Sequence, residues 1–323
     1  MRGSVRFTIP IPRSWSAKER CKTRNDLNRR FAGLVLGCLA ISVASGSELT
    51  LATYNVENYT ATNRVTAVGY RRDYPKSEKA KAALRGVIAH MDADVIVLQE
   101  MGPRSYLNEL QRDLRSEGLD YPYAHLAEAK DEVRHVAMLS KQPWLRVQTH
   151  ADLDFKYFEG REVVKRGLLE AVFETPEGEV TLWSMHLKSR YADRKDDPDS
   201  VKRRAGEATA IRNFIQKRFP DPEKTHYLIM GDFNDVKRSA SVRYMKKRGS
   251  HVISRLLSAK DSRGDHWTYH YHRTDTYSRV DHALVSLGLY DSVKGREARI
   301  FDGVDVEAAS DHRPIMVTLE FGD

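Results

Sequence analysis

Cysteine is nearly absent from this sequence, and long apolar runs and low-complexity linkers are absent as well. The only cysteines among the 323 residues are Cys21 and Cys38, and both precede residue 47. A chain that begins near residue 47 therefore has no disulfide and no thiolate site for a metal. The apolar stretch at 31–46 is shorter than the roughly 20 residues that a membrane-spanning helix needs. No internal repeat recurs at a fixed period, so the sequence does not predict a solenoid.

Charge of one sign is also missing from most of the chain, although the formal net charge is +8. Residues 1–46 hold nine Lys and Arg against two Asp and Glu, whereas residues 47–323 hold 44 and 43. The net charge therefore does not identify the partner as a polyanion such as nucleic acid. Hydrophobic residues make up 41% of the chain, which is enough for a large core in one or two domains.

The first 46 residues have the order of segments found in a secretory signal. A basic region precedes a short apolar stretch that ends in small residues. We therefore predict a secreted or periplasmic protein with a leader at 1–46, cleavage near residues 45–47, and one catalytic domain at 47–323. Three other interpretations stay open: an uncleaved anchor, a lipoprotein signal at Cys38, or a buried helix of the fold.

Beyond the leader, apolar residues recur with helical and strand periods in alternation. Ala80, Leu84 and Ile88, for example, share one face of a helix. Mixed strand pairs and crossover helices predict an α/β fold in which two sheets pack face to face. The predicted helices are 77–91, 104–117 and 200–219, and the predicted strands are 49–55, 94–98, 121–126, 134–140, 162–174, 179–186, 226–230, 266–272, 280–286 and 313–320.

Side chains with oxygen atoms suited to a metal follow the first two predicted strands. Asn55 ends the first strand, and Glu100 comes just after the second. Mg²⁺ prefers oxygen ligands, keeps several waters and commonly uses only one or two carboxylates. The pair therefore predicts a metal site at the sheet edge, whereas Glu100 by itself would be an ordinary exposed acid at a strand end.

Asp232 and Asn234 follow another apolar strand, 226–230, and Gly231 between them and the strand permits a tight backbone path. In an extended segment the two side chains point the same way. A carboxylate there can orient an attacking water while the amide donates to a phosphate oxygen, as hydrolysis of a phosphoester requires. The alternative is an ordinary Asp/Asn turn.

Asp311 and His312 lie in a polar break before the last predicted strand. An acid beside an imidazole can bind a metal and donate to a phosphate in one step. Asp281 can accept the other ring N–H of His312, which would fix the tautomer and raise the basicity of the ring. The alternative is a histidine with a structural hydrogen bond and no catalytic role.

His186 ends the predicted strand 179–186, and Lys188 lies two residues further on. An imidazole and an ammonium at one sheet edge suit a substrate phosphate, so we predict both residues in the site. Arg134 and Arg166 precede strand runs and can contact phosphate as well, although an ordinary surface cation is the simpler interpretation of each.

Three further histidines, His266, His270 and His272, share one face of the predicted strand 266–272. The aromatic residues between them would lie on the other face. We predict that the aromatic residues are in the core and that the histidines are solvated, with a zinc site as the alternative.

In their order and chemistry, these segments resemble the endonuclease/exonuclease/phosphatase superfamily. That group includes pancreatic-type DNase, abasic-site endonucleases, inositol polyphosphate phosphatases and neutral sphingomyelinases. The resemblance runs from about residue 49 to residue 319 and implies a four-layer α/β/β/α sandwich, in which helices flank two packed mixed sheets and the site lies at one end of them. Its most specific motifs are Thr53-Tyr54-Asn55-Val56-Glu57, Val97-Leu98-Gln99-Glu100, Gly231-Asp232-Phe233-Asn234-Asp235, Arg279-Val280-Asp281-His282 and Ser310-Asp311-His312-Arg313-Pro314.

The resemblance also implies a role for each predicted site residue. Mg²⁺, or alternatively Mn²⁺, would be held by Glu100 with Asn55 and Asp311 nearby, and Asp232 would position the nucleophilic water. Asn234 and His312 would bind the phosphoryl oxygens, and Asp281 would orient His312. Arg166 lies at a position where some members have a phosphate-binding arginine.

A histidine at the position of His186 is typical of the DNase, sphingomyelinase and phosphoinositide branches, and this resemblance implies that it protonates the leaving oxygen. The abasic-site branch has a Pro-Asn pair there and a catalytic tyrosine, for which Tyr123 is the nearest candidate here. The resemblance and the leader together argue against intracellular DNA repair. Glu132 is a candidate for the acid that would orient His186.

Our leading interpretation is a secreted or periplasmic phosphodiesterase that depends on a divalent metal and cleaves nucleic acid with low sequence specificity. The alternative is the same chemistry on a phospholipid or an inositol phosphate, and only that alternative implies a membrane partner. Action at a membrane predicts an exposed hydrophobic hairpin near the site, and none is obvious in the sequence. A binding protein without catalysis on this fold is a third interpretation. No stable protein partner is implied.

Overall fold

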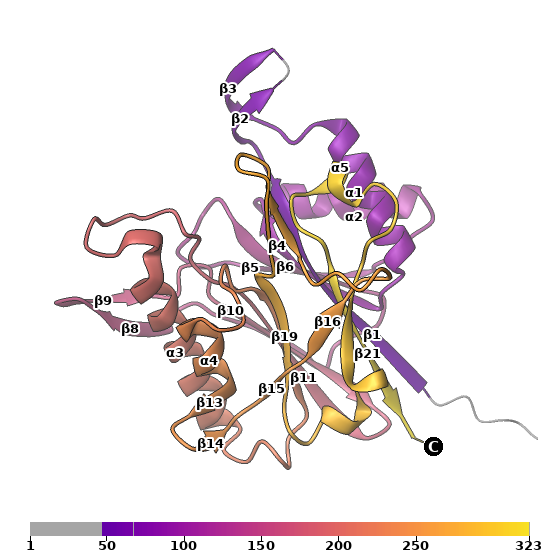
Figure 1. Ribbon diagram of the computed structural model, residues 1–323. Coiled ribbons are helices and arrows are strands. Elements are labelled where there is room, and N and C mark those ends of the chain that lie inside the picture. The colour runs from indigo at the N-terminus through magenta and orange to yellow at the C-terminus, as the bar shows by residue number, and fades with distance from the viewer. Residues whose placement is uncertain (1–46, 67, 323) are drawn as a thin grey trace, which may run out of the picture. The chain divides into compact units, whose positions relative to one another are not determined.

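The structure, a computed structural model, describes residues 47–66 and 68–322, so the predicted leader lies outside the described residues. Two mixed sheets form its centre (Figure 1). The first consists, in spatial order, of β16 (Ser258–Lys260), β20 (Glu297–Ile300), β21 (Ile315–Phe321), β1 (Ser47–Tyr59), β4 (Val95–Met101), β6 (His135–Ser140) and β5 (Tyr123–Ala127). The second consists of β15 (Arg255–Leu256), β19 (Asp281–Val285), β12 (Tyr227–Asp232), β11 (Gly178–His186), β10 (Leu168–Thr175) and β7 (Arg146–His150).

Helices and hairpins complete the described part of the chain. The helices are α1 (Glu78–Met91), α2 (Arg104–Ser116), α3 (Val201–Arg218), α4 (Ala240–Lys246) and α5 (Val306–Ala309). The separate hairpins are β2 (Thr62–Thr66) with β3 (Gly69–Tyr74), β8 (Asp154–Tyr157) with β9 (Gly160–Val163), β13 (Lys247–Arg248) with β14 (His251–Val252), and β17 (Tyr269–Tyr271) with β18 (Thr276–Ser278).

Three apolar clusters hold these elements in four layers, as predicted. Alternate residues of the strands point inward, so aliphatic side chains such as Leu51, Val97 and Leu182 fill the space between the sheets. The opposite face of the first sheet packs on α1 and α2. The opposite face of the second sheet packs on α3 and α4. The result is the α/β/β/α sandwich that the motifs implied.

The strand directions bring the polar segments to one edge of both sheets. β1 runs parallel to β4 and antiparallel to β21, so the ends of β1 and β4 lie beside the start of β21. In the other sheet β11 runs parallel to β12, and β19 runs antiparallel to it. This register pairs Asp232 with both His186 and Asp281. Gly231 is required there, because a Cβ would lie 2.0 Å from the Met185 carbonyl oxygen.

Two predicted strands differ from the structure. The strand predicted at 162–174 is divided into β9 and β10 by a turn in which Gly167 has a φ of +67°. The strand predicted at 266–272 is reduced to β17, and its aromatic residues are not in the core. The physical reason is that β17 forms a two-stranded sheet with β18 and, apart from an isolated bridge between Tyr269 and His312, joins neither central sheet.

A projecting hairpin, β2–β3, was not predicted from the sequence. It extends beyond the sheets at the end of β1 (Figure 1). Val65 and Val68 near its tip are 85% and 74% exposed. The expectation that the chain lacks an exposed hydrophobic hairpin was therefore wrong. In the described part of the chain, no helix has the length and apolar character needed to cross a bilayer.

Candidate active site

A cavity of about 650 Å³ opens at the edge where the central strands of both sheets end. Its lining contains most of the predicted site residues and several that were not predicted. From the prediction it includes Glu100, Asp232, Asn234, Asp311 and His312. Further lining residues are Glu57, Asn58, Arg190, Tyr191, Asp199, Tyr269, Tyr271, Thr276 and Ser278.

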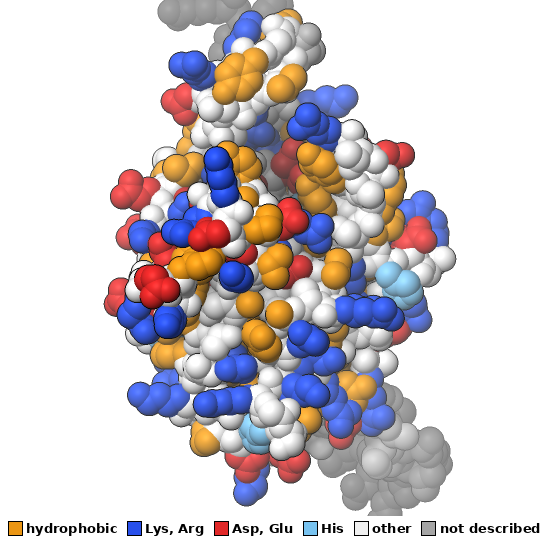
Figure 2. All heavy atoms as spheres, turned by 60° about the vertical axis from the view of Figure 1, so that its left-hand side comes forward, with side chains coloured by type: hydrophobic (Ala, Val, Ile, Leu, Met, Phe, Trp, Pro, Cys, Tyr) orange, Lys and Arg blue, Asp and Glu red, His pale blue; other side chains and the backbone are white. Residues whose placement is uncertain are grey.

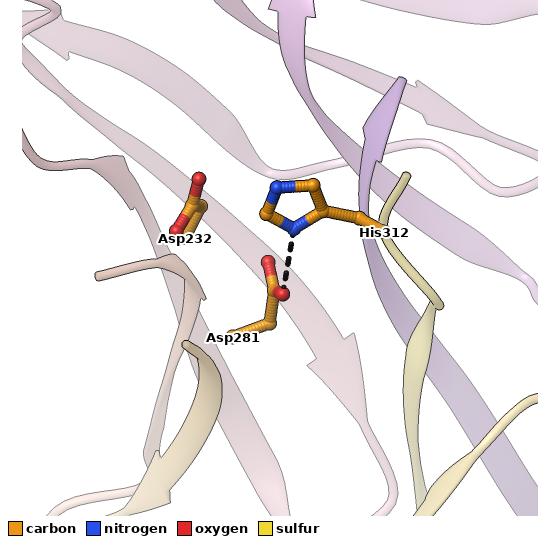
Figure 3. A group of neighbouring side chains, drawn as sticks. All are labelled: Asp232, Asp281 and His312. Carbon is orange, nitrogen blue, oxygen red and sulfur yellow. Dashed lines mark hydrogen bonds and ion pairs between the residues drawn. The ribbon is translucent and has the colours of Figure 1, made fainter. Parts of the chain in front are cut away.

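His312 forms the centre of the cavity floor. Its Nδ1 lies 2.8 Å from Asp281 Oδ2, which is the predicted contact, and its ring extends from there towards Asp232 (Figure 3). Burial alone would lower the pKa of His312, but the Asp281 and Asp232 carboxylates outweigh burial and raise the pKa well above its usual value. Burial and the Asp281 charge raise the pKa of Asp232 to about 7. His312 is therefore a cationic donor at neutral pH.

The Asp232 carboxylate accepts three hydrogen bonds from neighbouring amide groups. Its Oδ1 accepts from the Asn234 backbone N–H at 2.7 Å, and its Oδ2 accepts from Asn55 Nδ2 at 3.0 Å and from Asn234 Nδ2 at 3.1 Å. Asn234 Nδ2 also donates to the Leu187 carbonyl at 3.0 Å. The Asn234 amide hydrogens are thus used inside the protein. Contrary to the prediction, this amide orients Asp232 and does not present a free donor to a phosphate.

Three carboxylates, those of Glu57, Glu100 and Asp311, form the acidic side of the cavity. Burial, together with the Glu57 and Glu100 charges, raises the pKa of Asp311 to about 6, which shows that these negative charges are poorly compensated. Lys76 pairs with Glu57 at 3.1 Å. Uncompensated carboxylates around a cavity fit Mg²⁺ or Mn²⁺, because hard cations prefer such oxygens.

The backbone at this acidic side departs from regular strand geometry. Glu57, Asn58 and Glu100 have φ values of 48°, 51° and 63°, in the left-handed region that non-glycine residues seldom adopt. At Glu100 the pairing of β4 with β6 shifts register between Leu98 and Met101. A bulge of this kind redirects a side chain, and here it brings the Glu100 carboxylate to the cavity. Strain of this kind is common at functional sites.

Asn55 joins the acidic side to the floor. Its Nδ2 donates to Asp232, and its Oδ1 accepts from the Glu57 backbone N–H at 3.0 Å. A carbonyl oxygen has a second lone pair, so Asn55 can still serve a metal. Its side chain is buried and does not line the cavity, so the structure supports a positioning role at least as well as direct ligation.

Asp232, Asp281 and His312 form a second group that can hold a metal, since each places one ligand atom within 4.8 Å of the others. A cation on His312 Nδ1 would have to replace the hydrogen bond to Asp281. A cation in contact with the ring would also oppose the positive charge that the two carboxylates favour. We therefore interpret this group as acid–base machinery and the acidic side as the metal site.

His186, Lys188 and Arg166 lie behind the cavity and do not line it. Lys188 Nζ donates to the Tyr191 carbonyl, and Arg166 Nε donates to Asp131 Oδ2 at 2.9 Å. Neither cation is free, so direct phosphate contact by either residue is not supported. The physical reason is that both side chains are buried and used to hold the loops around the cavity.

His186 is also buried, and its Nε2 lies 3.5 Å from Asp232 Oδ2. Burial and the nearby Arg166 charge lower the pKa of His186 well below its usual value, so the ring is neutral and can donate a single N–H towards Asp232. Its Nδ1 has no hydrogen-bond partner among the described residues, and Glu132, the predicted partner, is exposed. A neutral ring below the floor suits the support of Asp232 better than protonation of a leaving group.

The sequence prediction missed several cavity residues. Glu57 was part of the first motif, and its acidic side chain two residues after Asn55 was a usable signal. Tyr269 and Tyr271 were assigned to the core because they alternate with histidines. The exposed tyrosines of a short hairpin carry no pattern that distinguishes them from a buried strand face. Of the three histidines considered for zinc, His270 instead contacts Asp275 at 2.8 Å.

Comparisons with known proteins agree with this geometry. The sequence model described as "Endonuclease/Exonuclease/phosphatase family" matches residues 52–312. No curated protein sequence matches the chain. Several solved structures share the fold, at identities too low to show more than the fold.

An endonuclease/exonuclease/phosphatase family protein from Leptotrichia buccalis is 19% identical, with a TM-score of 0.58, and the match covers 84% of this chain and all of that one. A beta toxin from Staphylococcus aureus with bound magnesium ions is 17% identical, with a TM-score of 0.58 and coverage of 85% and 100%. A sphingomyelinase C from Streptomyces griseocarneus is 15% identical, with a TM-score of 0.55 and coverage of 85% and 100%.

Proposed function

Because the chain belongs to the endonuclease/exonuclease/phosphatase family, we propose that it is a divalent-metal-dependent phosphodiesterase that cleaves nucleic acid with low sequence specificity. Members of this family are hydrolytic phosphoesterases. The observation that carries the proposal is one cavity with two complementary sides. Carboxylates including Glu100 and Asp311 line one side, and the cationic His312 and the buried Asp232 form the floor.

The floor residues supply proton handling and charge for such a reaction. A Mg²⁺ at Glu100 and Asp311, with Asn55 nearby, would neutralise phosphate charge and polarise the phosphoester. Asp232 orients a water and accepts its proton, which a carboxylate with a raised pKa does well near neutral pH. His312 donates to a phosphoryl oxygen while Asp281 stabilises its positive charge.

Two features support nucleic acid as the substrate. Arg190 lines the cavity and can contact the phosphate of a neighbouring nucleotide. Tyrosines also line the cavity, and aromatic side chains are common where unpaired bases bind. Neither feature is needed for a small phosphate monoester.

A substrate panel tests this proposal. Purified protein should be incubated with plasmid DNA, RNA, sphingomyelin vesicles, inositol phosphates and a plain monoester, each with Mg²⁺ and with EDTA. We expect cleavage of DNA or RNA that depends on the metal and is abolished by EDTA. Cleavage of only the monoester would contradict a phosphodiesterase, and Mg²⁺ binding without cleavage of any substrate would favour a non-catalytic binding protein.

The hairpin β2–β3 favours a second candidate, hydrolysis of a phospholipid at a membrane. Hydrophobic and cationic side chains cover this projecting part of the surface (Figure 2). Val65 and Val68 are exposed near the tip, and Tyr70 beside them is of the type enriched at bilayer interfaces. Arg64 fixes the base of the hairpin to the cavity edge, since it donates to the backbone carbonyls of Asn58 and, at 3.1 Å, Thr60.

Vesicles distinguish the two candidates. If the enzyme acts on lipid, Val65→Asp with Val68→Asp should lower hydrolysis of sphingomyelin in vesicles by about tenfold or more, because charged side chains oppose burial in the interface. The partly exposed pair Thr62→Asp and Thr66→Asp on β2 serves as a control for added charge. Loss of vesicle sedimentation together with hydrolysis would support the lipid substrate, and no vesicle binding by the unmodified protein would reject it.

Export is part of the proposal and rests on the leader alone. The full chain expressed with its leader should accumulate outside the cytoplasm as a shorter product, with its new N-terminus near residues 45–47 by mass spectrometry. Retention of an uncleaved chain in the cytoplasm would contradict export.

A further inference from the structure

Tyr269 and Tyr271 form a cavity wall that the proposed chemistry leaves unused. Both line the cavity together with Thr276 and Ser278. These four residues share one face of the β17–β18 hairpin, because Tyr269 pairs with Ser278 and Tyr271 pairs with Thr276 across the two strands. The wall therefore consists of aromatic rings and hydroxyl groups and contributes no charge.

This wall is joined directly to the catalytic segment. The His270 backbone N–H donates to the Asp311 carbonyl at 2.9 Å, and the Tyr269 ring centroid lies 4.7 Å from that of His312. The Tyr271 ring follows at 6.4 Å from Tyr269, with an angle of 27° between the two planes. The rings thus form a row that leads outward from His312. A phosphate held at His312 would have its attached groups beside this row of rings.

The loop after β11 supplies a positive charge and a further ring to this cavity. Arg190 and Tyr191 lie in the loop after β11 and line the same cavity. The Tyr191 ring is 5.7 Å from Lys188 Nζ, so it packs over a cation that is itself held by the loop. A volume of about 650 Å³ is in the range of sites that enclose a small organic ligand. The space between the walls can hold a nucleotide.

We propose that the pocket face of β17–β18 is a subsite for an unpaired nucleobase, stacked on Tyr271 beside the scissile phosphate, and that the enzyme therefore prefers single-stranded nucleic acid. This inference rests on the proposed function. Bases in a duplex are already stacked on their neighbours, so a ring on a cavity wall can meet only a base that has left the stack. The Thr276 hydroxyl lies across the hairpin from Tyr271 and is bonded to the Thr274 hydroxyl, and the Ser278 hydroxyl lies across from Tyr269. Both residues line the cavity, and their hydroxyls can bond to base edges.

A choline headgroup is the main competing ligand for an aromatic wall. Quaternary ammonium groups bind ring faces through their charge and neither donate nor accept hydrogen bonds. The hydroxyls on this wall would then have no partner in the ligand. The hydroxyls therefore favour a ring that donates and accepts hydrogen bonds.

Three strands of equal length test the subsite in saturating Mg²⁺: single-stranded oligothymidylate, the same backbone with abasic tetrahydrofuran residues, and a blunt duplex. The measured quantity is kcat/KM for each. We expect the unmodified protein to prefer the thymidine strand over both others by about tenfold or more, as stacking on one aromatic ring allows. Tyr271→Leu should bring the preference over the abasic strand close to one, and Tyr271→Phe should keep it.

Tyr244→Leu is the matched control, because Tyr244 on α4 is 37% exposed and Tyr271 is 42% exposed, while Tyr244 does not line the cavity. Equal cleavage of thymidine and abasic strands by the unmodified protein, or an unchanged preference in folded Tyr271→Leu, would overturn the subsite and leave the nuclease proposal intact. Cleavage neither of these strands nor of RNA in the substrate panel would reject the nuclease proposal and the subsite with it. Sphingomyelin hydrolysis that falls in Tyr271→Leu, without a base preference, would assign the wall to a choline headgroup.

As a second measurement, 2-aminopurine in the single strand should lose fluorescence on binding to Asp232→Asn, which is expected to bind without cleavage. Asp232→Asn with Tyr271→Leu should bind with little quenching. Full quenching without the Tyr271 ring would show that the base stacks elsewhere and would contradict the subsite.

Discussion

The floor and the rim of the cavity are built in opposite ways. On the floor, Asp232, Asp281 and His312 are buried and bonded to one another or to neighbouring groups. The two aspartates lie on adjacent strands of the second sheet, and His312 lies just before β21 of the first. On the rim, Tyr191 and Tyr271 are exposed and carried by a loop and a short hairpin. The difference indicates that one fold fixes the chemistry while peripheral segments choose the substrate.

The largest loss of activity should come from substitutions on the cavity floor. Asp232→Ala and His312→Ala should each lower kcat by about 10³-fold on every substrate that is cleaved, because both groups act on the reacting atoms. Steady-state kinetics checks this, with circular dichroism to show that the variants are folded. Asp120→Ala, which removes an exposed acid that does not line the cavity, is the control. Near-normal kcat in either floor variant would remove the role assigned to that residue.

If the floor depends on rigid support, loss of a buried ion pair beside it should lower the free energy of unfolding. Arg313, next to His312, donates to Asp261 Oδ2 at 2.8 Å, and both side chains are buried. Burial alone would raise the pKa of Asp261, but the Arg313 hydrogen bond and backbone N–H groups lower it to about 2. Asp261→Asn should reduce the free energy of unfolding at pH 7 by about 2–4 kcal/mol, because it leaves a buried charge without its partner.

The pH dependence of this effect has a definite sign. The folded-state pKa of Asp261 lies below the usual 3.8, so its stabilising contribution is present above pH 3.8 and is lost as pH falls towards 2. Urea unfolding at several pH values should show that the difference in free energy of unfolding between Asp261→Asn and the unmodified protein becomes smaller as pH falls from 3.8 towards 2. A constant difference down to pH 2 would mean that the carboxylate charge does not support the floor.

The acidic side allows a finer comparison between two carboxylates. Glu57 is paired with Lys76, whereas no Lys or Arg pairs with Glu100 among the described residues. Glu100→Gln should therefore raise the Mg²⁺ concentration for half-maximal activity by about tenfold or more, and Glu57→Gln by less. Titration calorimetry with Mg²⁺ provides a measurement independent of turnover. Equal effects of the two variants would contradict the assignment of Glu100 as the principal ligand.

The smallest change in activity should come from substitutions on the cavity rim. Tyr191→Ala should raise KM for a single-stranded oligonucleotide by about threefold to tenfold, because the exposed ring can stack on a base without touching the reacting phosphate. We expect kcat to change much less than KM. Tyr244→Ala provides the control for loss of a tyrosine. A large fall in kcat would place Tyr191 with the floor and weaken the distinction between the two regions.

The sequence predicts the floor well and the rim poorly, for physical reasons. Asn55, Asp232 and His312 each follow or precede an apolar strand, and strand ends in paired sheets meet at one edge, so their proximity could be predicted. Lys188 and Arg166 also lie near strand ends, but their side chains donate to the Tyr191 carbonyl and to Asp131 and do not line the cavity. Only the packed structure shows these acceptors. Tyr271 and Val65 lie in two-stranded hairpins without a covering layer, where apolar alternation no longer indicates burial.

Diffraction from crystals containing Mn²⁺, recorded at an X-ray energy where manganese scatters anomalously, tests the central claim most directly. The account predicts an anomalous peak bound by the Glu100 and Asp311 carboxylates, with the hydrogen bond between His312 and Asp281 retained. A peak held instead by Asp232, Asp281 and His312, or no peak in the cavity at saturating Mn²⁺, would contradict it.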